Sequence, residues 1–206
     1  MAFPLAPSEG CSVPKLLGCY EFPLHESLKA LASSDIEEIY DIGCAEGYYA
    51  VGFARLFPKT RILAFDINDN ARKTCEALAQ ANGVAAQVEV GRECDWQTLS
   101  FAQGKTRLVF CDIEGAERQL LDPSKATGLA HAHIIVECHD CFDAGIADEL
   151  TRRFTATHHI KRLRDDLPGT RALGSWFEKL PQLDRLIALW EWRTGDTPWL
   201  VMQPKA

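Results

Sequence analysis

The residues with the clearest chemical potential are an acid and two glycines in one short turn, followed by a second acid downstream. The turn spans Asp41–Gly47 (DIGCAEG) and comes directly after the apolar residues Ile39 and Tyr40. Asp66 closes the next apolar run, residues 61–66 (RILAFD). Glycines let a backbone pass close to a ligand, and an acid at the end of the following strand can accept both hydroxyls of a ribose. This combination predicts a nucleoside-binding site.

The glycine spacing distinguishes between nucleoside cofactors. A dinucleotide site needs Gly-x-Gly-x-x-Gly so that a helix N-terminus can approach the pyrophosphate, whereas this turn has no glycine two residues after Gly43. Glu46, near the start of the next helix, would also repel a pyrophosphate. The sulfonium and amino groups of S-adenosylmethionine tolerate nearby acids. The turn therefore favours S-adenosylmethionine, and an NAD-linked oxidoreductase is the disfavoured alternative.

Each residue of this site has an expected role. Asp41 is expected to fix the turn and the methionine end of the cofactor, and Asp66 to bind the ribose hydroxyls. Gly43 and Gly47 let the backbone approach the ligand. The simpler alternative is that the two acids only cap helices and that the glycines only turn the chain.

A second set of reactive residues follows two later apolar runs. Asp112 and Glu114 are two positions apart in extended chain and so share one side, as do Glu137 and His139. Ligands bind in the crevice at the carboxyl ends of parallel strands, where these residues are expected to lie. A hydroxyl acceptor of a methyl group needs a base or a metal to remove its proton.

We expect Asp112, Glu137 and His139 to be catalytic, with His139 as a general base. Asp112, Glu137, His139 and Asp140 could instead gather a divalent cation, because oxygen and imidazole ligands suit Mg, Mn or Fe; a base without a metal is preferred. Simpler roles are also open: Glu114 could start the following helix, Asp140 could cap the helix near residue 143, and His139 could bond to a backbone carbonyl.

Short apolar runs that alternate with helical segments predict the elements that position these residues. Strands are expected at residues 36–43, 61–67, 86–91, 107–113, 133–139, 158–164 and 198–203. Helices are expected at residues 24–32, 46–56, 68–81, 95–101, 116–121, 143–154 and 183–190, with a turn at 166–170 and an irregular stretch over the first twenty or so residues. The pattern indicates an α/β fold, a mostly parallel sheet of seven strands with helices on both faces. Residues 1–35 would be an N-terminal extension, and residues 36–206 one domain.

Three motifs resemble those of a known family. Residues 111–117 (CDIEGAE), with Leu120 and Leu121 after them, resemble the D-x-E-G-x-E…LL signature of FkbM-like methyltransferases, which follows a D-x-G-x-x-x-G turn there as it does here. Residues 17–21 (LGCYE) and 137–140 (ECHD) resemble one branch of that group. The resemblance covers roughly residues 16–165. It departs from the commoner pattern at residues 44–46 (CAE), where many members have Ala-Asn.

The resemblance implies a single-domain class I methyltransferase fold, which is Rossmann-like, with S-adenosylmethionine as cofactor. It places the adenine at residues 91–94 (GREC), so Glu93 and Cys94 are expected to contact it. Cys44, Ile67 and Asp112 complete the expected cofactor site. The family usually O-methylates small molecules or glycosides, so a small hydroxylated or glycosidic acceptor is expected. A non-catalytic module that binds S-adenosylmethionine is the main alternative.

Composition limits the remaining possibilities. The net charge of −7 and the lack of a Lys/Arg block disfavour a nucleic-acid partner. No apolar run approaches the about 18 residues of a membrane span, and the N-terminus has no signal-peptide pattern. Eight cysteines within apolar segments of a mid-sized chain indicate reduced thiols, so a cytoplasmic location is expected. The oligomeric state is not encoded in any motif.

Overall fold

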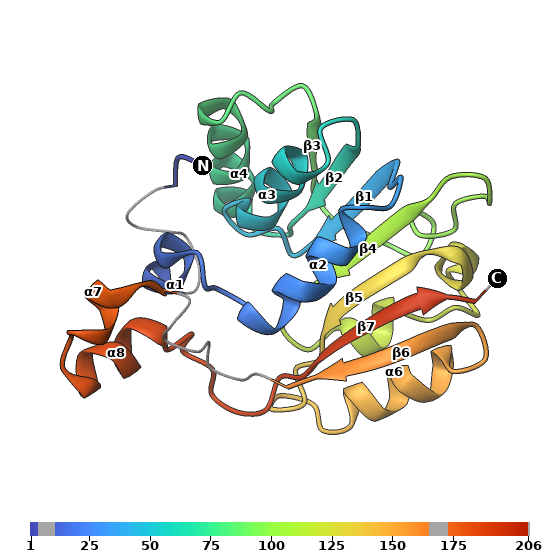
Figure 1. The fold of residues 1–206 in the computed structure, drawn as a ribbon. Helices are drawn as coiled ribbons and strands as arrows, with labels where there is room; N and C mark the ends of the chain where they lie inside the picture. Colours follow the sequence, from blue (N-terminus) through green and yellow to red (C-terminus); the bar gives the residue numbers. More distant parts are fainter. Residues whose placement is uncertain (4–10, 165–172, 206) are drawn as a thin grey trace.

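One mixed sheet organises the chain. The computed structural model describes residues 1–3, 11–164 and 173–205; the turn expected at 166–170 lies outside them. Seven strands have the order β3-β2-β1-β4-β5-β7-β6 (Figure 1), and β7 runs antiparallel to both of its neighbours. The strands are β1 (Glu38–Ile42), β2 (Arg61–Phe65), β3 (Val88–Gly91), β4 (Arg107–Cys111), β5 (His133–Glu137), β6 (His158–Leu163) and β7 (Trp199–Pro204). The predicted mostly parallel sheet is confirmed, with strand ends that differ by a few residues.

The central strands are buried on both faces, which explains their mostly apolar sequences. All five residues of β1 and of β4 are buried. Side chains alternate between two cores: Ile39 and Leu108 belong to one, and Tyr40 and Val109 to the other. The first core is covered by α2 (His25–Leu31), α3 (Tyr48–Leu56) and α4 (Asp69–Ala81), and the second by α5 (Glu117–Leu120) and α6 (Ile146–Phe154). The sheet thus carries helices on both faces, as predicted.

Local side-chain bonds set several helix ends. Asn68 accepts a hydrogen bond from the Asn70 amide and caps α4, as the sequence predicts. The helix expected at 95–101 is wrong. There the Asp95 carboxylate accepts hydrogen bonds from both the amide and the hydroxyl of Thr98, and such local bonds compete with helix formation.

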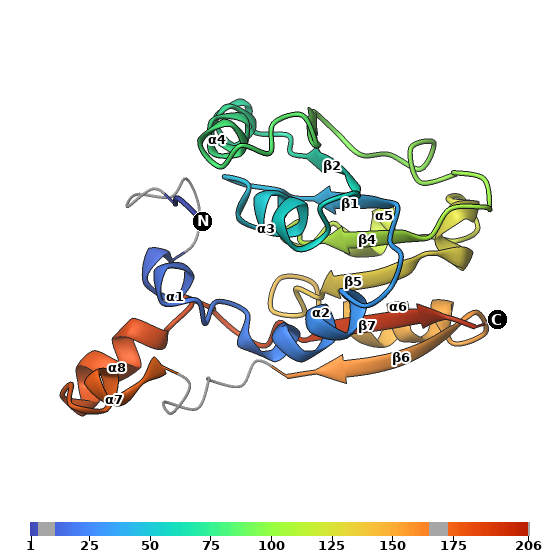
Figure 2. The same ribbon diagram turned by 45° about the horizontal axis from the view of Figure 1, so that its top comes forward.

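Two segments far apart in the sequence, residues 11–21 and 173–198, lie together over the carboxyl ends of the parallel strands (Figures 1 and 2). We call them the cap. It contains α1 (Ser12–Leu17), α7 (Ser175–Glu178) and α8 (Gln182–Leu189), and Cys19, Phe177 and Leu189 form a small core between them. Helix α1 was not expected from the sequence. Its Pro14 lies in the first turn, where no intrahelical amide bond is lost.

The N-terminal extension is packed as part of the fold. The 3-10 helix η1 (Phe22–Leu24) leads into α2, and Leu24 is fully buried in the first core. Among the residues that the structure describes, no helix combines the length and apolarity needed to cross a membrane.

Candidate active site

The Asp41–Gly47 turn is held against the ends of two neighbouring strands. The amides of Gly43 and Cys44 both donate to the Phe65 carbonyl at the end of β2, at 2.8 and 3.0 Å. A Cβ at Gly43, where φ is +85°, would lie 1.7 Å from the Asp112 carbonyl oxygen. A Cβ at Gly47, at φ +91°, would lie 2.7 Å from the sulfur of Cys75. Both glycines are therefore required by close backbone packing, apart from any ligand.

Asp66 connects this turn to the start of α4. One carboxylate oxygen accepts the Ala45 amide at 2.9 Å, and the other accepts the Asn68 amide at 2.8 Å. Each carboxylate oxygen has a second lone pair, so these bonds leave Asp66 able to accept further hydroxyl donors. Asp66 therefore lies where the sequence predicts a ribose acceptor, and it also orders the turn.

Asp41 is a buried acid with an unsatisfied atom. Its side chain lies beneath the turn at 1% exposure, and its Oδ2 has no hydrogen-bond partner. Burial, with the nearby charges of Asp112 and Asp66, raises the pKa of Asp41 to about 8. A buried carboxylate without a partner is unfavourable, so this position is suited to a cationic group of a ligand.

Glu46 does not present a free charge to a ligand. It is fully buried, and the Lys15 ammonium of α1 lies 2.5 Å from its Oε1. The rings of Phe3, Tyr20 and Tyr48 surround that ammonium at 4.8–5.9 Å. The repulsion of a pyrophosphate by Glu46, inferred from the sequence, is therefore wrong, because Lys15 neutralises the charge. The missing glycine remains the sequence feature that disfavours a dinucleotide.

The other expected cofactor residues differ in accessibility. Ile67, beside Asp66, is 78% exposed and offers an apolar surface at the sheet edge. Glu93 is exposed as well. Cys44 and Cys94 are buried, and their side chains belong to the two cores. Any contact of these two cysteines with a cofactor would come from the backbone.

A histidine surrounded by acids lies at the ends of β4 and β5. The His139 Nδ1 lies 2.8 Å from Oε1 of the fully buried Glu117. Its Nε2 faces three other carboxylates: Glu114 at 3.3 Å, Asp112 at 3.6 Å and Glu137 at 3.8 Å. We call these five residues the His139 cluster. It unites every residue that was expected to be catalytic.

The protonation of the cluster follows from its charges. Burial alone would raise the pKa of Glu117, but hydrogen bonds from His139 and the Gly115 amide lower it. Burial alone would lower the pKa of His139, but Glu117, Asp112 and Glu114 raise it above its ordinary value. Burial raises the pKa of Asp112 to about 7 against the opposing effect of His139, and Glu21 and Glu114 add to the rise.

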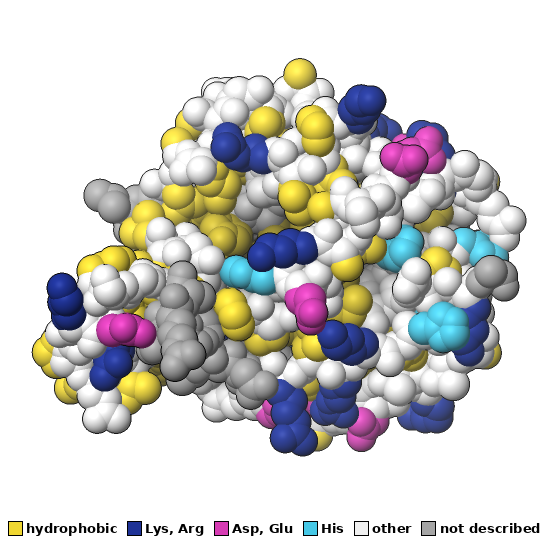
Figure 3. Space-filling view, in the orientation of Figure 1, with side chains coloured by type: hydrophobic (Ala, Val, Ile, Leu, Met, Phe, Trp, Pro, Cys, Tyr) yellow, Lys and Arg dark blue, Asp and Glu magenta, His cyan; other side chains and the backbone are white. Residues whose placement is uncertain are grey.

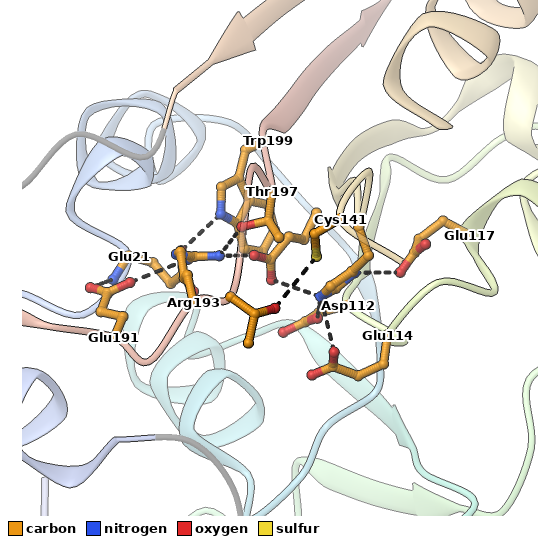
Figure 4. Close-up of polar contacts among 12 residues, drawn as sticks. Glu21, Asp112, Glu114, Glu117, Cys141, Glu191, Arg193, Thr197 and Trp199 are labelled. Atoms are coloured by element: carbon orange, nitrogen blue, oxygen red, sulfur yellow. Dashed lines mark hydrogen bonds and ion pairs between the residues drawn. The ribbon is translucent and has the colours of Figure 1, made fainter. Parts of the chain in front are cut away.

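A partly buried arginine lies beside the cluster. Arg193 forms ion pairs with Glu21 at 2.5 Å, with Glu191 at 3.2 Å and with Glu137. Glu21 also accepts a 2.8 Å hydrogen bond from the Trp199 indole. Figure 4 shows Arg193 between Glu21, Glu191 and Thr197, with Asp112, Glu114 and Glu117 farther to the right. Arg193 thus joins both cap segments to the end of β5. We call Arg193 and its three acidic partners, Glu21, Glu137 and Glu191, the Arg193 clasp.

Strained backbone conformations concentrate here. Among the described residues, positive φ angles outside glycine occur at Glu21 (50°), Ala45 (45°), Glu114 (55°) and Trp192 (61°). Ala45 belongs to the turn, Glu114 to the cluster and Glu21 to the clasp, while Trp192 precedes Arg193. Such strain persists only where surrounding contacts enforce it, and it gathers at functional sites.

Sequence reasoning assigned some roles incorrectly. Asp140 accepts the Ala147 amide at 3.0 Å and serves as a cap of α6, outside the cluster. Asp140 therefore does not lie with Asp112, Glu137 and His139 as the alternative metal set required, and Glu114 lies beside His139 instead. The role of Glu117 was missed, although it belongs to the D-x-E-G-x-E signature. The sequence around Arg193 (WEWR, residues 190–193) contains no motif that predicts its ion pairs.

Two hollows lie elsewhere on the surface. One of about 440 Å³ lies between the N-terminal segment and α3, where Figure 3 shows hydrophobic side chains gathered. The other, of about 390 Å³, lies at the amino ends of β4 and β5. No residue of the His139 cluster lines either hollow.

Comparison with known proteins agrees with this geometry. Residues 39–137 match the family described as "Methyltransferase domain". A search of curated proteins finds none that matches the chain. The O-methyltransferase TomG from Streptomyces achromogenes, involved in tomaymycin synthesis and solved in complex with SAM, is 16% identical with a TM-score of 0.59, over 98% of this chain and 93% of that one.

Enzymes with other acceptors share the fold. An rRNA methylase from Streptococcus thermophilus is 13% identical with a TM-score of 0.56, over 89% of this chain and 96% of that one. A precorrin-6y C5,15-methyltransferase from Geobacter metallireducens is 13% identical with a TM-score of 0.57, over 87% and 85%. The fold therefore does not fix the acceptor. The predicted class I fold and the predicted S-adenosylmethionine-dependent methyltransferase are confirmed: residues 39–137 match a methyltransferase domain, and the chain has the Rossmann-like class I fold.

Proposed function

We propose that this protein is an FkbM-like methyltransferase that transfers the methyl group of S-adenosylmethionine to a hydroxyl of a small molecule or glycoside. The observation that carries the proposal is the unsatisfied, buried Oδ2 of Asp41 beneath a glycine turn at the sheet edge. The methionine ammonium is a cation that would satisfy this atom.

The surrounding residues fit the rest of the cofactor. Asp66 has acceptor capacity left for the ribose hydroxyls. Exposed Ile67 offers an apolar contact for the adenine face next to that ribose position. Gly43 and Gly47 hold the turn in its positive-φ conformation, close to Asp112 and Cys75. These features support the proposed contacts with S-adenosylmethionine. None of them provides a site for the pyrophosphate of a dinucleotide.

The His139 cluster suits removal of a proton from the acceptor. S-adenosylmethionine supplies the methyl group; the acceptor oxygen forms a bond to that carbon as the carbon–sulfur bond breaks. Holding the acceptor in line provides most of the acceleration. Glu117 fixes the ring of His139 through Nδ1 and leaves Nε2 facing the site, where it can take the hydroxyl proton. Asp112 and Glu137 would stabilise the resulting imidazolium.

The negative charge of the site supports a small-molecule acceptor rather than a nucleic acid. Glu114 is 72% exposed at the mouth of the cluster, and Asp112 and Glu137 lie behind it. Carboxylates at the entrance repel a phosphate backbone, and the chain as a whole carries a net charge of −7. The eight cysteines are free thiols, which supports a cytoplasmic location.

Calorimetry with S-adenosylmethionine tests the proposal. The wild-type protein should bind it and should not bind NAD. The isosteric Asp66→Asn should weaken binding, whereas His139→Gln should retain binding and lose turnover. Binding of NAD instead, or unchanged affinity in Asp66→Asn, would contradict the proposed site. Binding without any turnover over a broad panel of hydroxylated acceptors would favour the non-catalytic module.

A further inference from the structure

The second ring nitrogen of His139 is the starting point for a further inference. The His139 side chain is 5% exposed, and its Nδ1 is bonded to Glu117. If Nδ1 carries the proton, then Nε2 presents a lone pair. That lone pair would face three carboxylates, those of Asp112, Glu114 and Glu137. Such an arrangement is repulsive unless Nε2 is also protonated or a cation lies between these atoms.

The distances are longer than those of direct charged hydrogen bonds. An imidazolium bonded to a carboxylate lies about 2.7–2.9 Å from it. Here Nε2 lies 3.3 Å from Glu114 Oε2 and 3.6 Å from Asp112 Oδ1. Metal–ligand bonds of about 2.0–2.3 Å at angles of about 90–110° place neighbouring donor atoms roughly 2.8–3.8 Å apart. The observed spacings match the edges of a coordination shell.

Two further observations point to a cation. The Oδ1 atom of Asp112 is itself buried and has no hydrogen-bond partner. One donor atom each from Asp112, Glu114 and His139 lie within 4.8 Å of one another. In addition, histidine ligands of metals usually donate their other ring N–H to a carboxylate, and Glu117 occupies that position.

We propose that Asp112, Glu114 and His139 bind one divalent metal ion of the Mn²⁺ or Fe²⁺ type, with Glu117 orienting the imidazole. One imidazole nitrogen and two carboxylate oxygens suit such ions, and three protein ligands leave positions open for the acceptor oxygen or water. Binding of the ion does not depend on the proposed function; its role in activating an acceptor does. In the metal-loaded protein His139 is a ligand, and the ion lowers the pKa of the acceptor hydroxyl in place of a base.

Titration of the full chain with Mn²⁺, after dialysis against a chelator, tests the site. Electron paramagnetic resonance of free Mn²⁺ should show one saturable site per chain. His139→Gln and Asp112→Asn should abolish it, and Glu117→Gln should weaken it by about 10–100-fold. Circular dichroism and thermal unfolding confirm that each variant is folded.

Asp143→Asn is the matched control. Like Asp112→Asn, it removes one carboxylate charge, but at a position four residues beyond His139. The Asp143 side chain pairs with Arg118 at 3.3 Å and lies outside the cluster. This variant should bind Mn²⁺ like the wild type. Absence of saturable binding up to millimolar Mn²⁺, or equal loss in Asp143→Asn and His139→Gln, would overturn the metal site. If the protein binds S-adenosylmethionine but not Mn²⁺, the metal site is overturned and the proposed function stands. If it binds Mn²⁺ but not S-adenosylmethionine, the metal site stands and the proposed function is overturned.

Discussion

Single residues at the carboxyl edge of the sheet carry unfavourable local free energies that ligand binding can relieve. Asp41 is buried with an unpaired oxygen, and Glu114 holds a left-handed backbone conformation at φ 55°. Neither feature helps the chain to fold. Because these residues also line the proposed site, the ligand-free protein is expected to be less stable than its fold would allow.

Asp41→Asn tests this at the level of one carboxyl group. The folded pKa of Asp41, about 8, lies above its ordinary value of 3.8. The folded state therefore binds the proton more tightly, and the stabilisation is fully present below about pH 4 and is lost as the pH rises through 8. In the absence of ligand, Asp41→Asn should be more stable than the wild type by about 1–2 kcal/mol at pH 5 and by several kcal/mol at pH 8.

Urea denaturation at both pH values measures this difference. Calorimetry at pH 8 should show that the same variant binds S-adenosylmethionine more weakly. A stability difference that is equal at pH 5 and pH 8 would show that Asp41 is not the titrating group.

Two glycines offer a matched pair of substitutions. Gly43→Ala would place Cβ 1.7 Å from the Asp112 carbonyl at a positive φ, so we expect a loss of several kcal/mol in the free energy of unfolding. Gly52→Ala, inside α3, meets no atom within 4 Å and should stabilise by about 0.5–1 kcal/mol. Thermal unfolding of both variants checks the pair; a mild effect at Gly43 would mean that the turn can move away from β4.

At the scale of elements, the Arg193 clasp holds the cap against the sheet. Three acids, Glu21, Glu137 and Glu191, pair with one guanidinium whose side chain is 12% exposed. Removing one partner of a buried ion pair leaves uncompensated charge, whereas exposed pairs contribute little. The clasp should therefore decide whether the cap stays closed.

Arg193→Met should lower the free energy of unfolding by about 3–5 kcal/mol and speed amide exchange in residues 11–21. The control Arg162→Met removes an exposed pair with Asp148 and should change stability by less than about 1 kcal/mol. Denaturation and hydrogen exchange followed by mass spectrometry measure both effects. Unchanged exchange in α1 would show that the cap is held by its apolar core alone.

The elements that follow simple periodic patterns are the ones that the sequence could predict. Buried strands such as β1 and β4 are short apolar runs, and the topology of a parallel sheet gathers their terminal acids at one edge. For that reason the amino-acid pattern alone was enough to place Asp41, Asp66 and Asp112 together. Helix α1 was missed because prolines in a sequence indicate irregular structure, whereas Pro14 lies in the first turn of the helix, where proline is tolerated.

The charged partners could not be predicted in the same way. Lys15 neutralises Glu46, and Arg193 contacts Glu21 across 172 positions of sequence. No local propensity or spacing specifies which loop folds over which strand end. The sequence does mark Glu117 as part of the D-x-E-G-x-E signature. Its bond to His139 could not be predicted from that signature, because the bond requires β4 and β5 to be adjacent.

At the scale of the molecule, the cap makes the N-terminal segment a structural part of the site. Removing residues 1–21 takes away Lys15 and Glu21 and exposes the small core around Phe177. The sheet and α2 should remain, so circular dichroism should change little, while binding of an apolar dye rises and affinity for S-adenosylmethionine falls. Full affinity in the truncated protein would show that the cap serves only the acceptor.

The separation of Glu21 from Arg193 has a consequence for how the protein is made. Contacts that are distant in sequence form late, because much of the chain must be ordered first. On the ribosome the early strands can pair before Glu21 meets Arg193, since residue 193 is synthesised 172 positions later. A nascent chain that stalls after β6 therefore holds the glycine turn and the His139 cluster uncovered, and synthesis of residues 173–198 is the step that encloses them.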